Sequence, residues 1–185
     1  MLDALCARDV VAIGRFPYHR WWQWRSRADD DTAINGALEA VGMRCFAQRP
    51  FSQLSSGERQ RVWIALGLAQ ETPTFLLDEP TSHLDVRVAH EILELLRRLA
   101  RTGKTIVCAL HDLNEAAAYA DRIALLGDGG MLAVAPTETL LNDPRVERVY
   151  GIAMERIRLA GGGLRVFAID ARPPFVERRS REPTT

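Results

Sequence analysis

Two stretches decide the fold: Leu54-Ser55-Ser56-Gly57-Glu58 and, further along the chain, Phe75-Leu76-Leu77-Asp78-Glu79-Pro80. Ser55 and Glu58 have the S-x-x-E spacing of a capping box, in which each side chain bonds the other residue's backbone N–H, so we expect a helix to begin there. A helix start directs free N–H groups and a positive dipole end outward, which suits a phosphate. The second stretch is a short apolar run ending in two carboxylates, as expected of a buried strand that delivers acids to the carboxyl edge of an open α/β sheet. Together the two stretches indicate phosphate chemistry with a metal ion.

Composition places the chain among ordinary globular proteins. It has 185 residues, of which 47% are hydrophobic and 26% charged, which is typical of one domain with a sizeable core. The formal net charge of +0 argues against a broad nucleic-acid surface. Its three cysteines, odd in number and without a C-x-x-C, fit a reducing cytoplasm. No apolar run approaches the ~18 residues of a membrane span, and the first residues lack the basic region of a signal peptide. Any association with a membrane is therefore expected to occur through a partner.

Strands and helices alternate after Ser55. A helix from Ser55 to about Gln70 is followed by an amphipathic helix, from Val88 to Leu99, that Asp85 is placed to cap. The predicted strands are Thr74–Leu77, Ile106–Leu110, Ile123–Leu126 and Met131–Val134, the last two forming a hairpin. This alternation, with short connections, predicts an α/β fold with a parallel sheet.

The flanking segments are interpreted from their composition. Asp29-Asp30-Asp31 predicts the solvated start of a small helix that ends at Gly42, in preference to a cation site. Residues 153–171 are expected to form a terminal hairpin, and residues 172–185, rich in proline and charge, a disordered tail.

Aromatic and basic residues gather between Gly14 and Arg27, where three of the four tryptophans lie. Such a mixture can stack on single-stranded nucleic acid, and it is also the composition that protein interfaces favour. Because the net charge of zero offers no wider basic face, a protein-contact surface is favoured over nucleic acid.

Asp78, Glu79 and His111 follow neighbouring predicted strands and are expected to meet at one edge of the sheet. An aspartate in this place can hold the Mg²⁺ of a nucleotide, and the adjacent glutamate can polarise an attacking water. A lone histidine after a strand is more often structural, but three polar residues at adjacent strand ends favour a site.

Gly103-Lys104-Thr105 is rejected as a phosphate-binding loop. A P-loop needs G-x-x-x-x-G-K-[ST] between a strand and a helix, whereas position 98 is arginine and the tripeptide follows a helix and precedes a strand. It predicts the turn that ends a helix. No other segment of the sequence fits the P-loop pattern.

Four blocks, in this order, resemble motifs of the ATP-binding-cassette (ABC) transporter ATPases. The signature motif, Walker B, the D-loop and the H-loop are matched by Leu54–Arg61, Leu76–Thr81, Ser82–Asp85 and His111-Asp112. The resemblance covers roughly residues 8 to 152 and implies a P-loop NTPase-like α/β fold, with part of the helical subdomain over about 8–70 and the Walker B and H-loop core over about 71–135. Two shorter blocks, Val11–Tyr18 and Tyr150–Ile152, resemble importers of iron(III)–siderophore complexes, haem and cobalamin.

The resemblance implies ATP and Mg²⁺ as cofactors and a role for each matching residue. Asp78 would hold Mg²⁺, Glu79 would be the general base, and His111 would contact the γ-phosphate. The remaining matched residues would act across a head-to-tail dimer with a second ATPase subunit: Ser55, Ser56, Gly57 and Glu58 at that subunit's ATP, and Asp85 at the dimer interface.

The resemblance also implies partners. The segment from Arg15 to Trp24 would dock on membrane permease subunits at the cytoplasmic face of the cell membrane. A periplasmic or surface binding protein would take part indirectly, and no nucleic acid would be bound. Hydrolysis of ATP to ADP and phosphate would drive import.

The sequence departs from the family pattern in three respects. Ser56 replaces the usual second glycine of the signature, and His83 a usually small residue of the D-loop. The Walker A loop, the adenine-stacking aromatic and the Q-loop glutamine would precede residue 8 and are not in the sequence, so the chain by itself is expected to be inactive.

Three alternatives stay open. One is a non-catalytic interaction fragment that lends its signature to a full-length ATPase. Another is a remnant or a misplaced start, with an uncovered strand edge and poor solubility. The last is an ABC ATPase of another system, for import, repair or translation.

Overall fold

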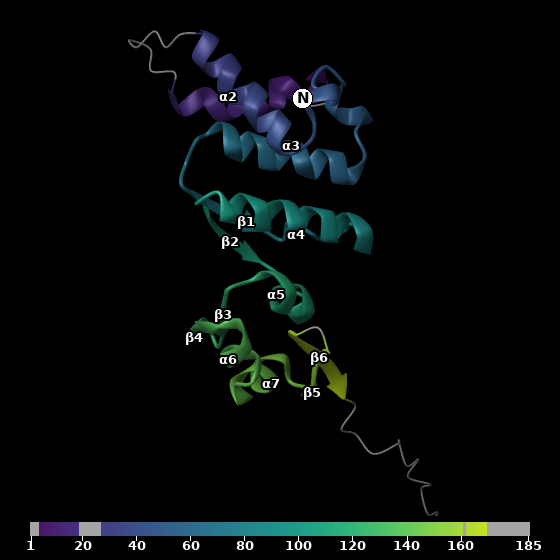
Figure 1. The fold of residues 1–185 in the computed structure, drawn as a ribbon, viewed down its shortest axis with the longest axis vertical. Helices are drawn as coiled ribbons and strands as arrows, with labels where there is room; N and C mark the ends of the chain where they lie inside the picture. Colours follow the sequence, from purple (N-terminus) through teal and green to yellow (C-terminus); the bar gives the residue numbers. More distant parts are fainter. Residues whose placement is uncertain (1–3, 19–26, 161, 170–185) are drawn as a thin grey trace, which may run out of the picture. The chain divides into compact units, whose positions relative to one another are not determined.

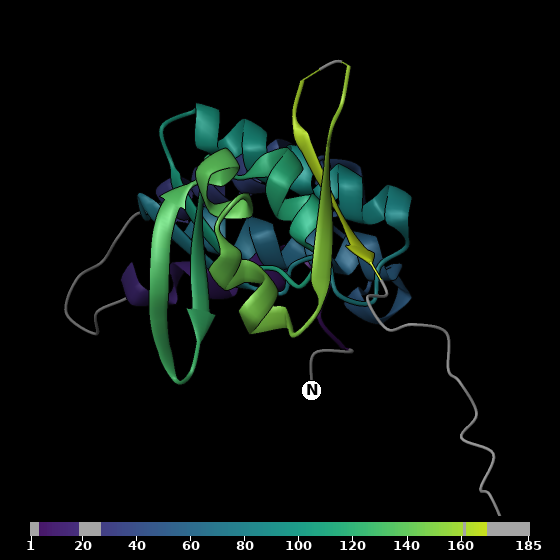
Figure 2. The ribbon, with the colours of Figure 1, turned by 90° about the horizontal axis from the view of Figure 1, so that it is seen from below.

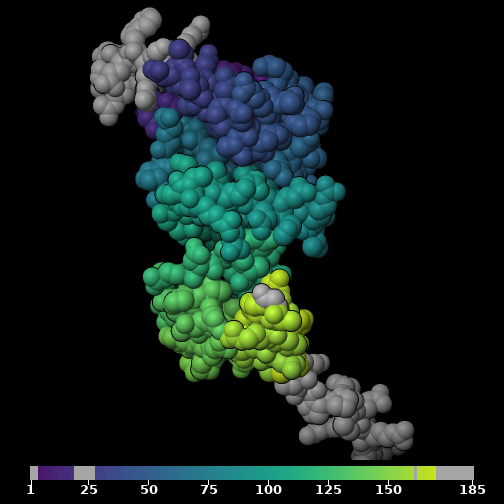
Figure 3. All heavy atoms as spheres, viewed as in Figure 1, coloured from purple at the N-terminus to yellow at the C-terminus, as the bar shows by residue number. Residues whose placement is uncertain are grey.

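The computed structural model describes residues 4–18, 27–160 and 162–169. The chain divides into two compact units, Met1–His111, coloured purple to teal in Figure 3, and Asp112–Thr185, coloured green to yellow. Across the described residues, no helix is both long and apolar enough to cross a bilayer. The predicted disordered tail lies outside these residues.

Helices dominate the start of the first unit. They are α1 (Ala7–Ala12), α2 (Arg27–Ala40), α3 (Ser56–Ala69) and α4 (Val86–Arg101), with the short 3₁₀ helices η2 (Ile13–Tyr18), η3 (Arg44–Phe46) and η4 (Phe51–Gln53). α3 contacts α1, α2 and α4, and Figure 1 shows it between α2 and α4. Because helices surround α3, it buries side chains in several directions: Val62, Ile64, Ala65, Leu68 and Ala69.

Two strands complete the first unit. β1 (Thr74–Asp78) and β2 (Thr105–Ala109) pair in parallel, with Asp78 opposite Ala109, which confirms the parallel arrangement predicted for these two segments. α4 begins at the cap that Asp85 provides and buries its apolar stripe of Ile92, Leu95, Leu96 and Leu99, also as predicted. The parallel pairing places the carboxyl ends of both strands at one edge.

The turn after α4 confirms that Gly103-Lys104-Thr105 is not a phosphate loop. Gly103 has φ +93°, a left-handed conformation that glycine adopts without strain. Lys104 then leads into β2, and its Nζ donates to the Thr72 carbonyl oxygen at 3.0 Å.

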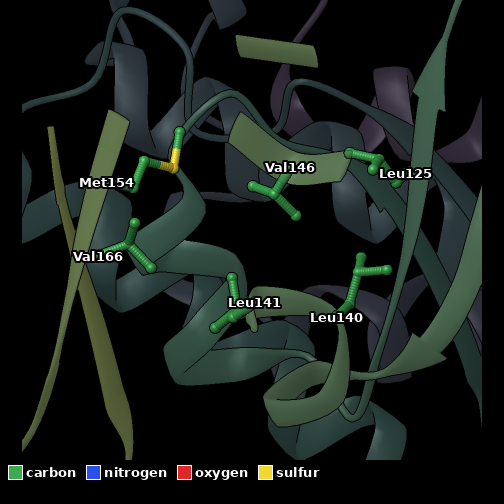
Figure 4. Close-up of a cluster of buried hydrophobic side chains, with 6 residues drawn as sticks. All are labelled: Leu125, Leu140, Leu141, Val146, Met154 and Val166. Atoms are coloured by element: carbon green, nitrogen blue, oxygen red, sulfur yellow. The ribbon is translucent and has the colours of Figure 1, made fainter. Parts of the chain in front are cut away.

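The second unit contains two antiparallel hairpins, drawn in green and yellow in Figure 2. β3 (Arg122–Gly127) pairs with β4 (Gly130–Pro136), and β5 (Ala153–Arg158) pairs with β6 (Leu164–Ile169). Helices α5 (Leu113–Tyr119), α6 (Thr137–Leu141) and α7 (Pro144–Tyr150) accompany them. Figure 4 shows the core side chains: Leu125, Leu140, Leu141, Val146, Met154 and Val166.

The third and fourth predicted strands form the hairpin that the sequence predicts. In the described part of the chain, β3 pairs antiparallel with β4. The tight turn between them places Asp128 at φ 51° and Gly129 at φ 76°. Such a turn joins neighbouring segments at a small loop-closure cost, which favours the hairpin.

Candidate functional site

The predicted capping box forms at the start of α3. Ser55 Oγ accepts from the Glu58 backbone N–H at 3.3 Å, and the Ser55 backbone N–H donates to Glu58 Oε2 at 2.8 Å. The latter bond lowers the pKa of the Glu58 carboxyl, and Arg49 Nη1 lies 3.6 Å from Glu58 Oε1. The negative charge of Glu58 is thus partly offset, and the amides of Ser56 and Gly57, which a first helical turn cannot bond internally, face the helix start.

Gly57 and Ser56 lie in different surroundings. Gly57 is buried, and a Cβ added to it would lie 2.5 Å from Val88 Cγ1 of α4, whereas Ser56 is exposed. Asp85 caps α4 by accepting from the Val88 backbone N–H at 3.0 Å. The start of α3, which carries the signature block, therefore contacts the start of α4, which Asp85 caps, at Val88.

A second cluster forms where β1 and β2 end. Glu79 directly follows β1 and has φ +44°. Its Oε1 lies 2.6 Å from His111 Nε2, and its Oε2 accepts from Ser82 Oγ at 2.6 Å. The Ser82 hydroxyl and then the His111 imidazole lower the pKa of the Glu79 carboxyl. The side chains of His111 and Glu79 are 79% and 41% exposed, so the pair is open to solvent.

Asp78 is exposed at the last position of β1, beside Glu79. Among the described residues, no group of three or more His, Cys, Asp or Glu side chains could hold a metal ion. Mg²⁺ is commonly bound through only one or two carboxylates together with nucleotide phosphates. Asp78 therefore fits as one carboxylate ligand of a nucleotide-bound Mg²⁺.

The two clusters are not bonded directly to each other in the described part of the chain. Over the described ranges, no hydrogen bond or ion pair joins Ser55–Glu58 to Asp78, Glu79 or His111. Ser82 was not among the residues expected from the sequence, although the proline at position 80 signals the turn that places it.

The structure corrects the expectation for Arg15 and Asp30. Arg15 is only 1% exposed, so it cannot form part of a docking surface. Its Nε donates to Asp30 Oδ1 at 2.9 Å, and its Nη1 donates to the Ala69 carbonyl oxygen at 2.6 Å and to Glu71 Oε2 at 2.7 Å. Asp30 is also buried, and not solvated as expected. The buried charge of Arg15 requires a partner, and Asp30 provides the opposite charge.

Most of the expected docking segment lies outside the described residues, which omit 19–26. In the part that is described, Phe16 is 76% exposed, and Pro17 is also exposed.

Comparison with known proteins relates the chain to a family. The sequence profile of the ABC transporter family matches residues 7–82. The achromobactin transport ATP-binding protein CbrD of Dickeya dadantii is 41% identical over 151 residues, covering 81% of this chain and 56% of that protein. The hemin import ATP-binding protein HmuV of Rhodococcus jostii is 45% identical over 152 residues, covering 82% of this chain and 51% of that protein.

A solved structure agrees with the sequence relatives. A metal-chelate type ABC transporter in an inward-facing conformation matches with a TM-score of 0.80 and 27% identity, over 90% of this chain and 67% of that one. By sequence and by fold, the chain corresponds to part of an ABC transporter ATPase domain, which has the P-loop NTPase fold. It spans about half the length of the curated relatives it matches.

Proposed function

We propose that this chain provides the signature helix, the Walker B strand and the switch histidine of an ATP-hydrolysing importer subunit. The observation that carries the proposal is the Glu79 carboxylate, which contacts His111 where two parallel strands end. The cargo is proposed to be an iron–siderophore complex or another metal chelate such as haem. The similarity to an achromobactin transport protein and a hemin import protein supports this cargo class.

Glu79 is proposed to act as the general base. As water attacks the γ-phosphorus of ATP, the bond to the bridging oxygen of ADP breaks and the proton of the water passes to the Glu79 carboxylate. His111 orients that carboxylate and contacts the γ-phosphate. Asp78 would hold Mg²⁺, which offsets the negative charge of the phosphates when it is bound.

The signature block is proposed to act on the ATP of a second subunit. The helix start offers the amides of Ser56 and Gly57 to an anion, while Ser55 and Glu58 shape that start. Asp85 lies at the start of the neighbouring helix and is proposed to line the dimer interface. Among the described residues, no hydrogen bond or ion pair joins the two clusters, which agrees with this division, because each nucleotide in a head-to-tail dimer lies between Walker B of one subunit and the signature of the other.

Association with a full-length relative tests this proposal. The chain is titrated against the Rhodococcus jostii hemin import ATPase with and without ATP, by light scattering. ATP is expected to strengthen the binding, and Ser55→Arg is expected to abolish that gain by filling the helix start. Ser52→Arg, on the exposed preceding turn, is the matched control and is expected to keep the gain. The proposal would be refuted if ATP did not change the affinity, or if Ser55→Arg and Ser52→Arg had the same effect on the ATP-dependent gain.

Turnover by the 185-residue polypeptide alone is a second test. Because the printed sequence contains no P-loop pattern to hold the phosphates, we expect no phosphate release above that of Glu79→Gln. Turnover that disappears in Glu79→Gln would contradict this expectation.

Membrane permease subunits are the proposed docking partners, at the cytoplasmic face of the membrane. The transport and import names of the relatives support this, as does the structural match to an ABC transporter. A binding protein outside the cytoplasm would deliver cargo to the permease without touching this chain.

A further inference from the structure

The last turn of α3 is capped by side chains of η2. An α-helix leaves its last four carbonyl groups without partners inside the helix. Arg15 Nη1 donates to the Ala69 carbonyl oxygen at 2.6 Å, and Tyr18 Oη donates to the Gln70 carbonyl oxygen, also at 2.6 Å. The positive charge of the guanidinium also offsets the negative end of the helix dipole. The end of α3 is thus held by a different helix, far from it in the sequence.

The same cap holds a strained residue just after α3. Glu71 has φ +54°, a left-handed conformation that glycine usually occupies at the end of a helix. Arg15 Nη1 also donates to Glu71 Oε2 at 2.7 Å, and the Arg15 guanidinium lies 4.1 Å from the centroid of the Tyr18 ring. A strained backbone persists only where the surrounding contacts hold it. Arg15 and Tyr18 therefore fix the path by which the chain leaves α3.

η2 lies too close to α3 for either helix to tilt freely. A Cβ at position 14 would lie 2.3 Å from the Leu66 backbone oxygen, so the glycine backbone lies directly against the last turns of α3. The Arg15 side chain is only 2% exposed, so water cannot replace the partners of its charge. A tilt of α3 relative to η2 would therefore stretch hydrogen bonds that nothing else can satisfy.

We propose that Arg15 and Tyr18 are positioning residues for the signature block at the opposite end of α3. The helix has 14 residues and is therefore about 21 Å long. Over that length, a tilt of about 3° at the capped end moves the amides of Ser56 and Gly57 by about 1 Å. A binding site must hold its groups within about 0.5 Å of their places. The positioning role rests on the proposed function of the signature block, but the cap itself is a property of the chain without nucleotide.

Amide hydrogen exchange, followed by NMR in the full chain, tests the cap. The reporters are the backbone N–H groups of Gln70 and Glu71, which close the last turn of α3. Tyr18→Phe removes only the hydroxyl and keeps the ring against the Arg15 guanidinium. Because one hydrogen bond to the end of the helix is lost, the protection factors of both reporter amides are expected to fall about two- to tenfold.

Three further variants serve as controls and as a second measurement. Tyr150→Phe makes the same chemical change in the second unit and is expected to leave both reporter amides unchanged. Phe16→Ala alters an exposed residue of η2 and is also expected to leave them unchanged. Glu71→Gln removes a charged partner of Arg15 at a half-exposed side chain. It is expected to lower the protection of the reporter amides even if Tyr18→Phe fails to fold.

The ATP-dependent association with the Rhodococcus jostii hemin import ATPase separates positioning from a purely structural cap. Tyr18→Phe is expected to lose most of the gain that ATP gives and to keep the affinity measured without ATP. Unchanged protection factors in Tyr18→Phe would overturn the cap, and lower protection with a full ATP gain would overturn the positioning role. If binding of the wild-type chain did not respond to ATP, the proposed function of the signature block would be refuted, and the exchange result would still decide the cap.

Discussion

Gly14→Ala is expected to destabilise the first unit by pushing η2 away from α3. A Cβ at position 14 would lie 2.3 Å from the Leu66 backbone oxygen and 3.3 Å from Ala69 Cβ. A backbone oxygen in a helix cannot rotate aside as a side chain can. To restore an ordinary C···O separation of about 3.3 Å, η2 must shift by about 1 Å.

The expected loss in the free energy of unfolding depends on which contacts the shift of η2 disturbs. Overpacking a buried position costs typically about 1–3 kcal/mol. Arg15, the next residue, donates to the Ala69 carbonyl oxygen at 2.6 Å, so the same shift stretches a buried charged hydrogen bond. We therefore expect a loss near the upper end of the range, about 3 kcal/mol.

Gly36→Ala is the matched control. Gly36 lies inside α2, and a Cβ there would meet nothing within 4 Å. Alanine at an open position inside a helix is favoured over glycine by about 0.5–1 kcal/mol. The same chemical change is thus expected to stabilise the protein at position 36 and destabilise it at position 14.

Urea unfolding followed by far-UV circular dichroism measures both variants, with free energies from linear extrapolation. In thermal melts, a loss of about 3 kcal/mol corresponds to a Tm lower by about 6–12 °C for a protein of this size. A Gly14→Ala variant within about 0.5 kcal/mol of wild type, the range of an ordinary surface substitution, would refute the reasoning. So would two variants that change stability in the same direction.

Two further predictions concern buried and exposed charge. Arg15→Leu is expected to lower the free energy of unfolding by about 3–5 kcal/mol, because it removes the buried guanidinium that pairs with the Asp30 carboxylate. In urea unfolding, adding Asp30→Leu is expected to recover much of that loss; strictly additive losses would contradict the argument. Arg145 lowers the pKa of Asp143 from 3.8 to about 2, so the stabilisation from Asp143 is complete above its unfolded pKa and is lost as the pH falls towards 2. Asp143→Asn is expected to flatten the dependence of Tm on pH between about 4 and 2, and an unchanged slope would count against the ion pair.

Local signals in the sequence predict most of the helices and strands. The S-x-x-E spacing at Ser55 predicts a capping box, and Gly103 predicts the end of α4; both appear. The hairpin of β3 and β4 is predicted in the same way, from the glycine-rich turn at residues 127–130, and it also appears.

The burial of Asp30 could not be predicted from the composition of the Asp29–Asp31 run. Three consecutive aspartates resemble a solvated helix start, but successive side chains on a helix point about 100° apart. Asp30 lies four residues before Ile34 and eight before Leu38, on the stripe that α2 buries. The phase of that stripe, and not the charge of the run, identifies the aspartate that turns inward. The partner, Arg15, is brought to it only by the tertiary packing of η2.

The second cluster was partly predictable. Because the carboxyl ends of parallel strands meet at one edge, the sequence alone places Glu79 near His111, and the structure joins them at 2.6 Å. Ser82 was missed because a serine three residues after a glutamate is unremarkable unless the turn between them is recognised. Pro80 gives that signal, and the bond from the Ser82 N–H to the Glu79 carbonyl oxygen confirms the turn.

Positions 56 and 57 of the signature block are constrained differently, because one is exposed and the other is buried. At position 57, a Cβ would lie 2.5 Å from Val88 Cγ1, so a larger residue would force the Val88 side chain of α4 to move, whether or not a nucleotide is present. At position 56, the side chain is exposed, and serine changes only what can approach the helix start. The clash at 57 falls on the helix start that Asp85 caps through the Val88 backbone N–H. The departure from the family pattern at Ser56 is therefore compatible with the fold, and its effect is confined to the anion that the helix start is proposed to meet.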